Sequence, residues 1–267
     1  MKASRVGSLV AAIALAGVIA YYALREPAPV SPPVPVAAAP ESPTSLGEPG
    51  TEPPIRHPVE AGEPAPSEAG ADPLPALDES DAAVGASVAG LFAESGRPDV
   101  LLLKDIVRRV VVTVDNLPRE RVARRLSPLK PAEGGLQVSR QGDDLVISDL
   151  NRERYAPFVK LAETVDIGYL AALYRRFYPL FQQAYLELGY PRGYFNDRLV
   201  AVIDHLLATP EPAGPLRLIQ PKVLYQFADP ELERLSAGQK YLLRMAPDDA
   251  ARIKARLREF RGHVAGR

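Results

Sequence analysis

The chain has 267 residues, 46% of them hydrophobic, with a formal net charge of −1 and no Cys. The near-neutral charge gives no indication of the large basic surface with which proteins bind nucleic acid, so no nucleic-acid partner is expected. The lack of Cys excludes disulfides and thiolate chemistry.

The first apolar stretch, Val6 to Leu24, contains 19 residues and no charged side chain. At about 1.5 Å per residue, a helix of this length spans roughly 28 Å, close to the hydrocarbon core of a bilayer. Lys2 and Arg5 precede it, so the positive-inside rule predicts a cytoplasmic N-terminus and places the following chain outside. A cleaved signal peptide is the alternative. Cleavage after Ala23 would place Tyr21 at position −3, where the usual cleavage site has a small residue. We expect residues 1–25 to form a cytoplasmic stub and an uncleaved transmembrane signal-anchor.

A proline-rich stretch follows, with thirteen Pro within Glu26–Asp72, interleaved with Ala, Glu, Ser and Gly. Such a composition cannot bury enough apolar area to offset the entropy lost on ordering. We therefore expect residues 26–76 to be a disordered linker. Residues 77–267 are numerous enough for one domain with a hydrophobic core.

The first part of this domain predicts two helices, a hairpin and a third helix. A short helix begins near Asp78, and Asn151 to Val165 has helical apolar spacing. Between them, Val100 to Leu117 is ambiguous, because its many Val residues favour a strand while its spacing favours a helix; we favour the helix. Leu136 to Ser148 alternates polar and apolar residues around Gly142, which predicts a β-hairpin.

The central prediction is a pair of helices within Asp166 to Pro210. Asp166 can cap the first helix, and Gly189 followed by Pro191 can end it. A second apolar helix runs from about Phe195 to Ala208. The short loop between them predicts an antiparallel αα-hairpin. The apolar stripe of the first helix is formed by Ile167, Leu170, Tyr174, Phe177, Phe181, Ala184 and Leu188.

The C-terminal part predicts short extended segments and three helices. The extended segments are Leu216–Ile219 and Val223–Phe227, and the helices begin near Asp229, Ser236 and Pro247. The last helix is strongly basic. The expected fold is mainly α: one helical domain around a long central αα-hairpin with a small β-hairpin, preceded by a transmembrane helix and a disordered linker.

Few residues have the spacing of a reactive site. The three His, at 57, 205 and 263, form no zinc-binding pair, and we expect neither a metal nor a cofactor. Asp197 and Asp204 lie seven residues apart, roughly 10 Å along one helix face. This approaches the carboxyl separation of an inverting glycosidase, about 6.5–9.5 Å. The ordinary explanation is that both Asp lie on a solvated helix face and pair with Arg198 or Arg192.

The aromatic residues indicate a different kind of site. Residues 155–195 hold seven of the eleven Tyr and four of the seven Phe. Tyr residues off the main stripe indicate either a helix buried on two sides or an exposed Tyr/Arg surface for a partner. The candidate partner-binding residues, in or beside the loop between the two helices, are Tyr190, Arg192, Tyr194 and Asn196.

Six phrases of the folded part carry a resemblance to known proteins: RRVVVTVDNLPR (108–119), YPLFQQAYLELGYP (178–191), GYFNDRL (193–199), VIDHLLATPEP (202–212), QPKVLYQFADPELE (220–233) and GQKYLLRM (238–245). With these phrases the chain resembles, over about residues 77–262, a family of bacterial proteins catalogued as domain of unknown function 3014. The resemblance implies a Gram-negative envelope protein with one N-terminal membrane segment and a proline-rich linker; it implies no activity, cofactor or catalytic residue.

The expected function is therefore a non-catalytic, membrane-tethered periplasmic module that binds or scaffolds an envelope protein or the cell wall. The alternative is a carboxylate-dependent peptidoglycan hydrolase that uses Asp197 and Asp204. The expected location is the bacterial inner membrane, with one transmembrane pass and the folded domain in the periplasm.

Overall fold

The computed structural model describes residues 54–59, 73–90, 92 and 100–266. The expected transmembrane segment and most of the expected linker lie outside these residues. Within the described residues, no helix has both the length and the apolar character needed to span a membrane.

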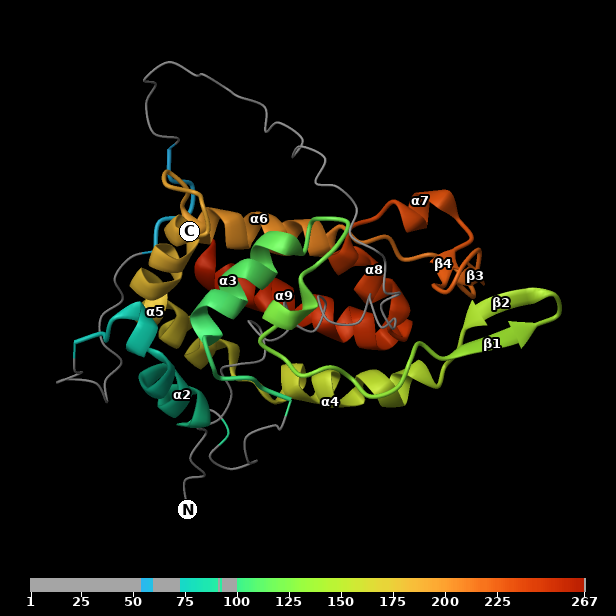
Figure 1. Ribbon diagram of the computed structural model, residues 1–267, viewed down its shortest axis with the longest axis horizontal. Helices are drawn as coiled ribbons and strands as arrows, with labels where there is room; N and C mark the ends of the chain where they lie inside the picture. Colours follow the sequence, from blue (N-terminus) through green and yellow to red (C-terminus); the bar gives the residue numbers. More distant parts are fainter. Residues whose placement is uncertain (1–53, 60–72, 91, 93–99, 267) are drawn as a thin grey trace, which may run out of the picture.

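The described part of the chain is mainly α, as predicted, with eight α-helices and one small antiparallel sheet (Figure 1). Most buried apolar side chains belong to one continuous core, to which every described α-helix except α7 contributes. The helices are α2 (Asp81–Gly90), α3 (Ile106–Asn116), α4 (Asn151–Thr164), α5 (Ile167–Glu187), α6 (Phe195–Leu207), α7 (Pro230–Glu233), α8 (Ala237–Arg244) and α9 (Pro247–Val264), with 3-10 turns η2 (Leu77–Glu79) and η3 (Arg124–Leu126).

The long helix α5 is buried on two sides, by α3 and by α9. The side chain of Asp166 accepts a hydrogen bond from the Tyr169 N–H at 2.9 Å and caps the helix, as predicted. Gly189, with φ at +111°, follows its end. Tyr178 and Tyr185, which fall off the main apolar stripe, are buried, whereas Tyr169 is exposed. Burial on two sides therefore accounts for most of the aromatic residues of α5.

The ambiguous segment 100–117 forms a helix only in its second part. Residues 106–116 are α3, and its Val side chains pack into the core at helical spacing. Before α3 the chain is extended, and Leu101 pairs with Leu129. The carboxylate of Asp81 accepts hydrogen bonds from the backbone N–H groups of Asp105 and Ile106. The residue that caps α3 thus comes from α2, which sequence spacing could not show.

The predicted αα-hairpin is arranged differently from the expectation. Hydrogen bonds and ring contacts between α5 and α6 come from Phe195 and Asn196 in the first turn of α6. Beyond that turn, α6 extends away from α5 and packs against α3 and α9 (Figure 1). The reason is that the apolar face of α5 is already covered by other helices.

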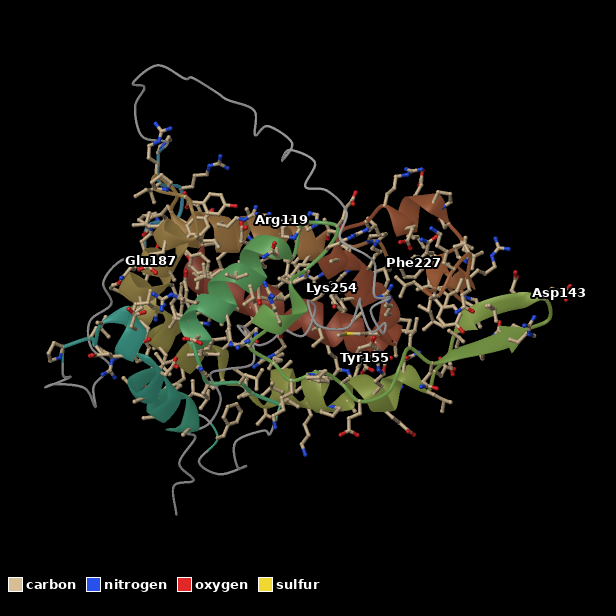
Figure 2. The ribbon with its side chains drawn as sticks, in the orientation of Figure 1. Arg119, Asp143, Tyr155, Glu187, Phe227 and Lys254 are labelled. Atoms are coloured by element: carbon tan, nitrogen blue, oxygen red, sulfur yellow. The ribbon has the colours of Figure 1, made fainter. Side chains whose placement is uncertain are left out.

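The predicted β-hairpin is confirmed as β1 (Val138–Gln141) and β2 (Asp144–Ile147). Two short strands, β3 (Arg217–Ile219) and β4 (Gln226–Phe227), extend it into an antiparallel sheet of order β1-β2-β3-β4. The sheet lies at one end of the molecule, far from the end of α5 that carries Glu187 (Figures 1 and 2). A second, smaller apolar cluster is centred on Leu218, Phe227 and Leu243.

The basic helix α9 is a central element, in contact with α4, α5, α6 and α8. Four of its five cations bind other parts of the chain. Lys254, for example, is buried and donates to the Thr209 carbonyl at 2.7 Å (Figure 2). Its basic composition therefore serves mainly to attach neighbouring segments to the core.

Candidate functional site

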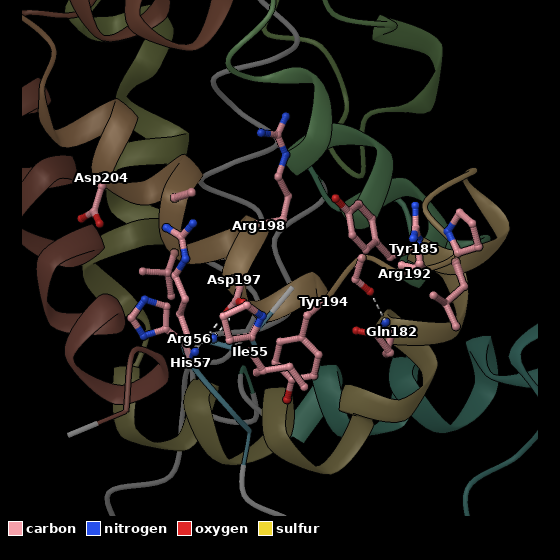
Figure 3. A pocket seen from close by; sticks show the side chains of 16 residues that line it. Ile55, Arg56, His57, Gln182, Tyr185, Arg192, Tyr194, Asp197, Arg198 and Asp204 are labelled. Atoms are coloured by element: carbon pink, nitrogen blue, oxygen red, sulfur yellow. Dashed lines mark hydrogen bonds between the residues drawn. The ribbon is translucent and has the colours of Figure 1, made fainter. Parts of the chain in front are cut away.

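The loop from α5 to α6 binds a short segment of the chain's own proline-rich region, residues 54–59. Asp197, in the first turn of α6, accepts hydrogen bonds from the backbone N–H groups of Arg56 and His57, at 3.0 and 2.7 Å (Figure 3). The hydroxyl of Tyr194 accepts another from the Val59 N–H at 2.8 Å. The sequence places this segment in the linker, whereas the structure shows it in contact with the helical domain.

Asn196 connects the bound segment to the core. It is fully buried, and its side-chain amide donates to the carbonyls of His57 and Val264, at 2.8 and 2.7 Å. Its amide oxygen accepts from the Tyr174 hydroxyl at 3.0 Å. A buried amide needs such partners, so part of the hydrogen-bonding capacity of Asn196 is satisfied by the segment itself.

The segment also reaches the C-terminal end of α9. The His57 ring makes a short hydrogen bond to the Ala265 carbonyl. Every contact described so far, except that of this ring, uses the backbone of the bound segment. The backbone donors lie at three non-proline positions, while Pro58, which has no N–H, lies among them.

Tightly packed aromatic rings hold the loop in place. Tyr194 packs on Tyr178 with 5.4 Å between ring centroids, and Tyr190 stacks on Tyr185 at 4.6 Å. Gly193 passes so close to Tyr185 that a Cβ would lie 2.6 Å from the ring. Burial raises the pKa of the Tyr178 hydroxyl above its usual range, so this group stays protonated.

Tyr190 joins a buried carboxylate instead of the bound segment. Its hydroxyl donates to Asp115, at the end of α3, at 3.0 Å. Arg119 and Arg198 also donate to that carboxylate, at 2.5 and 3.0 Å. The pKa of the Tyr190 hydroxyl is raised by burial and by the charge of Asp115. This network fixes the loop to α3 and α6.

A cavity of about 590 Å³ lies between the bound segment and the loop. Arg192 lines it and is exposed, without a hydrogen bond or ion pair to any described residue. Gln182 lines it too, and its amide donates to the Gly193 carbonyl at 2.7 Å (Figure 3). The bound segment therefore does not fill this cavity, and other chemical groups have room beside it.

The two predicted carboxylates have separate partners. Asp204 forms a two-bond ion pair with Arg261 of α9, at 2.5 and 2.9 Å, while Asp197 holds the backbone of residues 56 and 57. Asp204 is therefore paired with an Arg, as the ordinary explanation expects, but the partner is Arg261 and not Arg198 or Arg192. Among the described residues, no group of three or more His, Asp or Glu is placed to hold a metal ion.

Of the four predicted partner-binding residues, the structure places Tyr194 and Asn196 against the segment, Arg192 at the cavity and Tyr190 in the Asp115 network. Sequence reasoning missed both Asp197 as an acceptor for a peptide backbone and the segment itself. One signal was available. Between residues 26 and 72, the only Ile, Arg and His are Ile55, Arg56 and His57.

The fold and site define a mainly helical domain whose α5–α6 loop contacts residues 54–59 of the same chain. The family model described as protein of unknown function (DUF3014) matches residues 106–261, from the start of α3 into the last turns of α9. The chain therefore belongs to this family. No curated protein and no solved structure matches it.

Proposed function

We propose that the protein is a non-catalytic, membrane-tethered periplasmic module that binds a short, proline-containing segment of an envelope protein at the α5–α6 loop. One observation carries this proposal: Tyr194, Asn196 and Asp197 already hold the backbone of residues 54–59. Because these bonds go to backbone atoms, a segment of different sequence with donors at the same positions can make them too.

In this proposal, residues 54–59 occupy the site until a partner segment replaces them. A segment tethered to its own site has an effective concentration on the order of millimolar, so it competes with free peptide. The partner therefore binds best when it is itself held nearby, as proteins of one membrane are. The tether is supported by the apolar stretch Val6 to Leu24 and by the family resemblance. Digestion of intact spheroplasts tests its orientation, because external protease should reach residues after Leu24.

The test uses the full-length chain with residues 54–59 replaced by Gly and Ser. A fluorescent peptide that spans residues 52–60 should bind this variant saturably in a polarisation assay. It should bind the unaltered chain at least about tenfold more weakly, because the chain's own segment competes. No saturable binding to the replaced variant would contradict the proposal.

Two further variants of the replaced chain locate the binding. Asp197→Asn loses a charged acceptor for two backbone N–H groups. It should lower the affinity for the peptide roughly 10- to 100-fold, since a hydrogen bond to a charged group contributes about 1.5–3 kcal/mol. Asp143→Asn is the matched control, because Asp143 lies at the tip of the β1–β2 hairpin, far from the loop (Figure 2). Equal affinities in the two variants would place the peptide elsewhere.

No observation favours the alternative, a peptidoglycan hydrolase. A general acid must offer a protonated carboxyl to its substrate, and here Asp204 is ion-paired while Asp197 accepts two backbone hydrogen bonds. The alternative stays a prediction that a sacculus-digestion assay can test. It requires activity of the purified chain that Asp204→Asn removes.

A further inference from the structure

A second cavity, of about 410 Å³, lies at the opposite end of the molecule, between the sheet and helices α8 and α9. It shares no lining residue with the cavity at the α5–α6 loop. Much of its wall is apolar, with contributions from Leu216, Leu242, Met245 and Pro247. A volume of this size lies within the range of about 300–1,000 Å³ that is usual for small-molecule sites.

One charged residue in the wall of this cavity, Arg244, lacks a counter-charge. Arg244 is only 8% exposed, and its Nε atom is buried with no hydrogen-bond partner. Within the described residues, its guanidinium forms no hydrogen bond and no ion pair. The guanidinium lies over the Phe227 ring, whose centroid is 5.9 Å from Cζ. An arginine keeps its charge in proteins, and the buried Nε–H of Arg244 is left without an acceptor, which is unfavourable.

The other two cations that line the cavity already have acidic partners. Arg152 pairs with Asp248 through two hydrogen bonds of 2.7 Å. Lys254 donates to the Thr209 carbonyl and pairs with Glu211 at 2.8 Å. Among the described residues that line this cavity, Arg244 is therefore the cation left to bind an external anion.

The lining also limits the kind of anion. The carboxylates of Asp149 and Glu211 lie in the same wall, so a dianion such as a phosphate monoester would meet like charges. A single carboxylate matches the charge of one guanidinium and accepts its paired N–H groups. The apolar wall then favours a ligand whose remaining part is apolar.

We propose that this cavity binds a small monocarboxylate with an apolar body, whose carboxylate pairs with Arg244. The apolar body lies against Leu216, Leu242 and Met245. A short fatty acid and the α-carboxylate of an apolar amino acid share this chemistry. The site does not depend on the proposed function of the α5–α6 loop, because the two cavities have no residue in common.

The sequence provides a direct probe of this cavity. The chain has two Met, and one of them, Met245, is buried in the cavity wall. Full-length protein labelled with ¹³C at the Met methyl groups should therefore report binding through one resonance, with Met1 as the reference. The probes are hexanoate, N-acetyl-leucine and hexanol, which has an apolar body without a charge.

We expect at least one of the two carboxylates to shift the Met245 resonance saturably. The one that binds with the higher affinity tells whether the site prefers a fatty acid or the α-carboxylate of an apolar amino acid. Hexanol should bind at least about tenfold more weakly than hexanoate, because it cannot form the charged hydrogen bonds. Arg244→Gln should lower the affinity for the tighter-binding carboxylate by a similar factor. Arg121→Gln is the matched control: Arg121 is exposed and lines neither cavity.

Three results would overturn the proposal. The Met245 resonance could stay unmoved by both carboxylates, hexanol could match the better carboxylate, or Arg244→Gln could bind like the unaltered chain. Each would mean that the cavity does not bind a carboxylate at Arg244. If Arg244→Gln does not fold, the comparison of hexanol with the carboxylates on the unaltered chain still decides.

Discussion

Asp115, at the edge of the candidate site, is a buried carboxylate that connects several elements through hydrogen bonds. Its side chain is only 3% exposed, yet three donors reach it, from Arg119, Tyr190 and Arg198. These donors come from three parts of the chain: the segment after α3, the α5–α6 loop and α6. The carboxylate therefore holds together the elements that position the loop.

Replacing this carboxylate should destabilise the protein. We expect Asp115→Asn to lower the free energy of unfolding by roughly 2–3 kcal/mol, below the ~3–5 kcal/mol of a fully buried pair, because both guanidiniums reach solvent. Urea denaturation followed by circular dichroism measures the change. The control is Asp144→Asn, whose partner Arg217 is exposed, and a loss of less than about 1 kcal/mol is expected there. Equal losses would show that the Asp115 network contributes no more than a surface pair.

The candidate residues at the loop were only partly predictable. The Tyr-rich loop pointed to Tyr194 and Asn196, because aromatic and polar residues at a helix–helix connection are typical of binding sites. The sequence singles out Asp197 by its spacing to Asp204, and both residues belong to the same helix, α6. Its partners, Arg56 and His57, lie 141 and 140 residues away. The unusual composition of residues 55–57 marks the segment within the proline-rich stretch, but neither its contact with Asp197 nor the unpaired charge of Arg244 leaves a local pattern in the sequence.

At the scale of elements, local signals were reliable and distant pairings were not. The hairpin turn at Gly142 and the cap at Asp166 depend on neighbouring residues, and both were predicted. The joining of β3 and β4 to that hairpin depends on the packing of residues far apart. The apolar stripe of α5 was recognised, but the stripe alone could not show which helices cover it.

Helices α4 and α9 are joined by an exposed ion pair, Arg152 with Asp248, that makes the stability of the protein depend on pH. Hydrogen bonding to Arg152 lowers the pKa of Asp248 from its ordinary value of 3.8 to about 2. The unfolded chain therefore takes up this proton at a higher pH than the folded chain does. The contribution is complete above about pH 5 and is lost as the pH falls towards 2.

Asp248→Asn should remove this part of the pH dependence. The urea midpoint of the unaltered chain should decline between pH 4 and 2 more steeply than that of the variant, while the two curves run parallel above pH 5. Because the pair is exposed, high salt should bring the two curves closer together. Parallel curves over the whole range, at low salt, would show that the pair does not couple α4 to α9.

At the scale of the whole molecule, the two cavities lie at opposite ends of one helical body. The loop cavity is bordered by the chain's own segment 54–59, which also contacts the C-terminal end of α9. In the proposed membrane-tethered arrangement, docking of this segment would shorten the free length between the anchor and the domain, so the distance of the domain from its anchor would depend on whether the segment is docked.

Spin labels can measure this docking directly, because the chain has no Cys and two introduced Cys are the only labelling sites. With labels at the exposed residues Ile55 and Leu150, double electron–electron resonance on the full-length chain should give a narrow distance distribution. Asp197→Asn removes the charged acceptor of two hydrogen bonds and should broaden it.

A reference pair separates release of the segment from general loosening of the domain. Leu150 and Leu188 are exposed and both belong to the helical body. The distribution of distances between labels at these two positions should therefore stay narrow in Asp197→Asn. Broadening of both pairs would mean that the substitution disturbs the fold. A broad distribution for Ile55 and Leu150 in the chain without Asp197→Asn would mean that the segment is not held in solution. The proposed peptide site would then lose the contact on which it is based, while the carboxylate site at Arg244 would be unaffected.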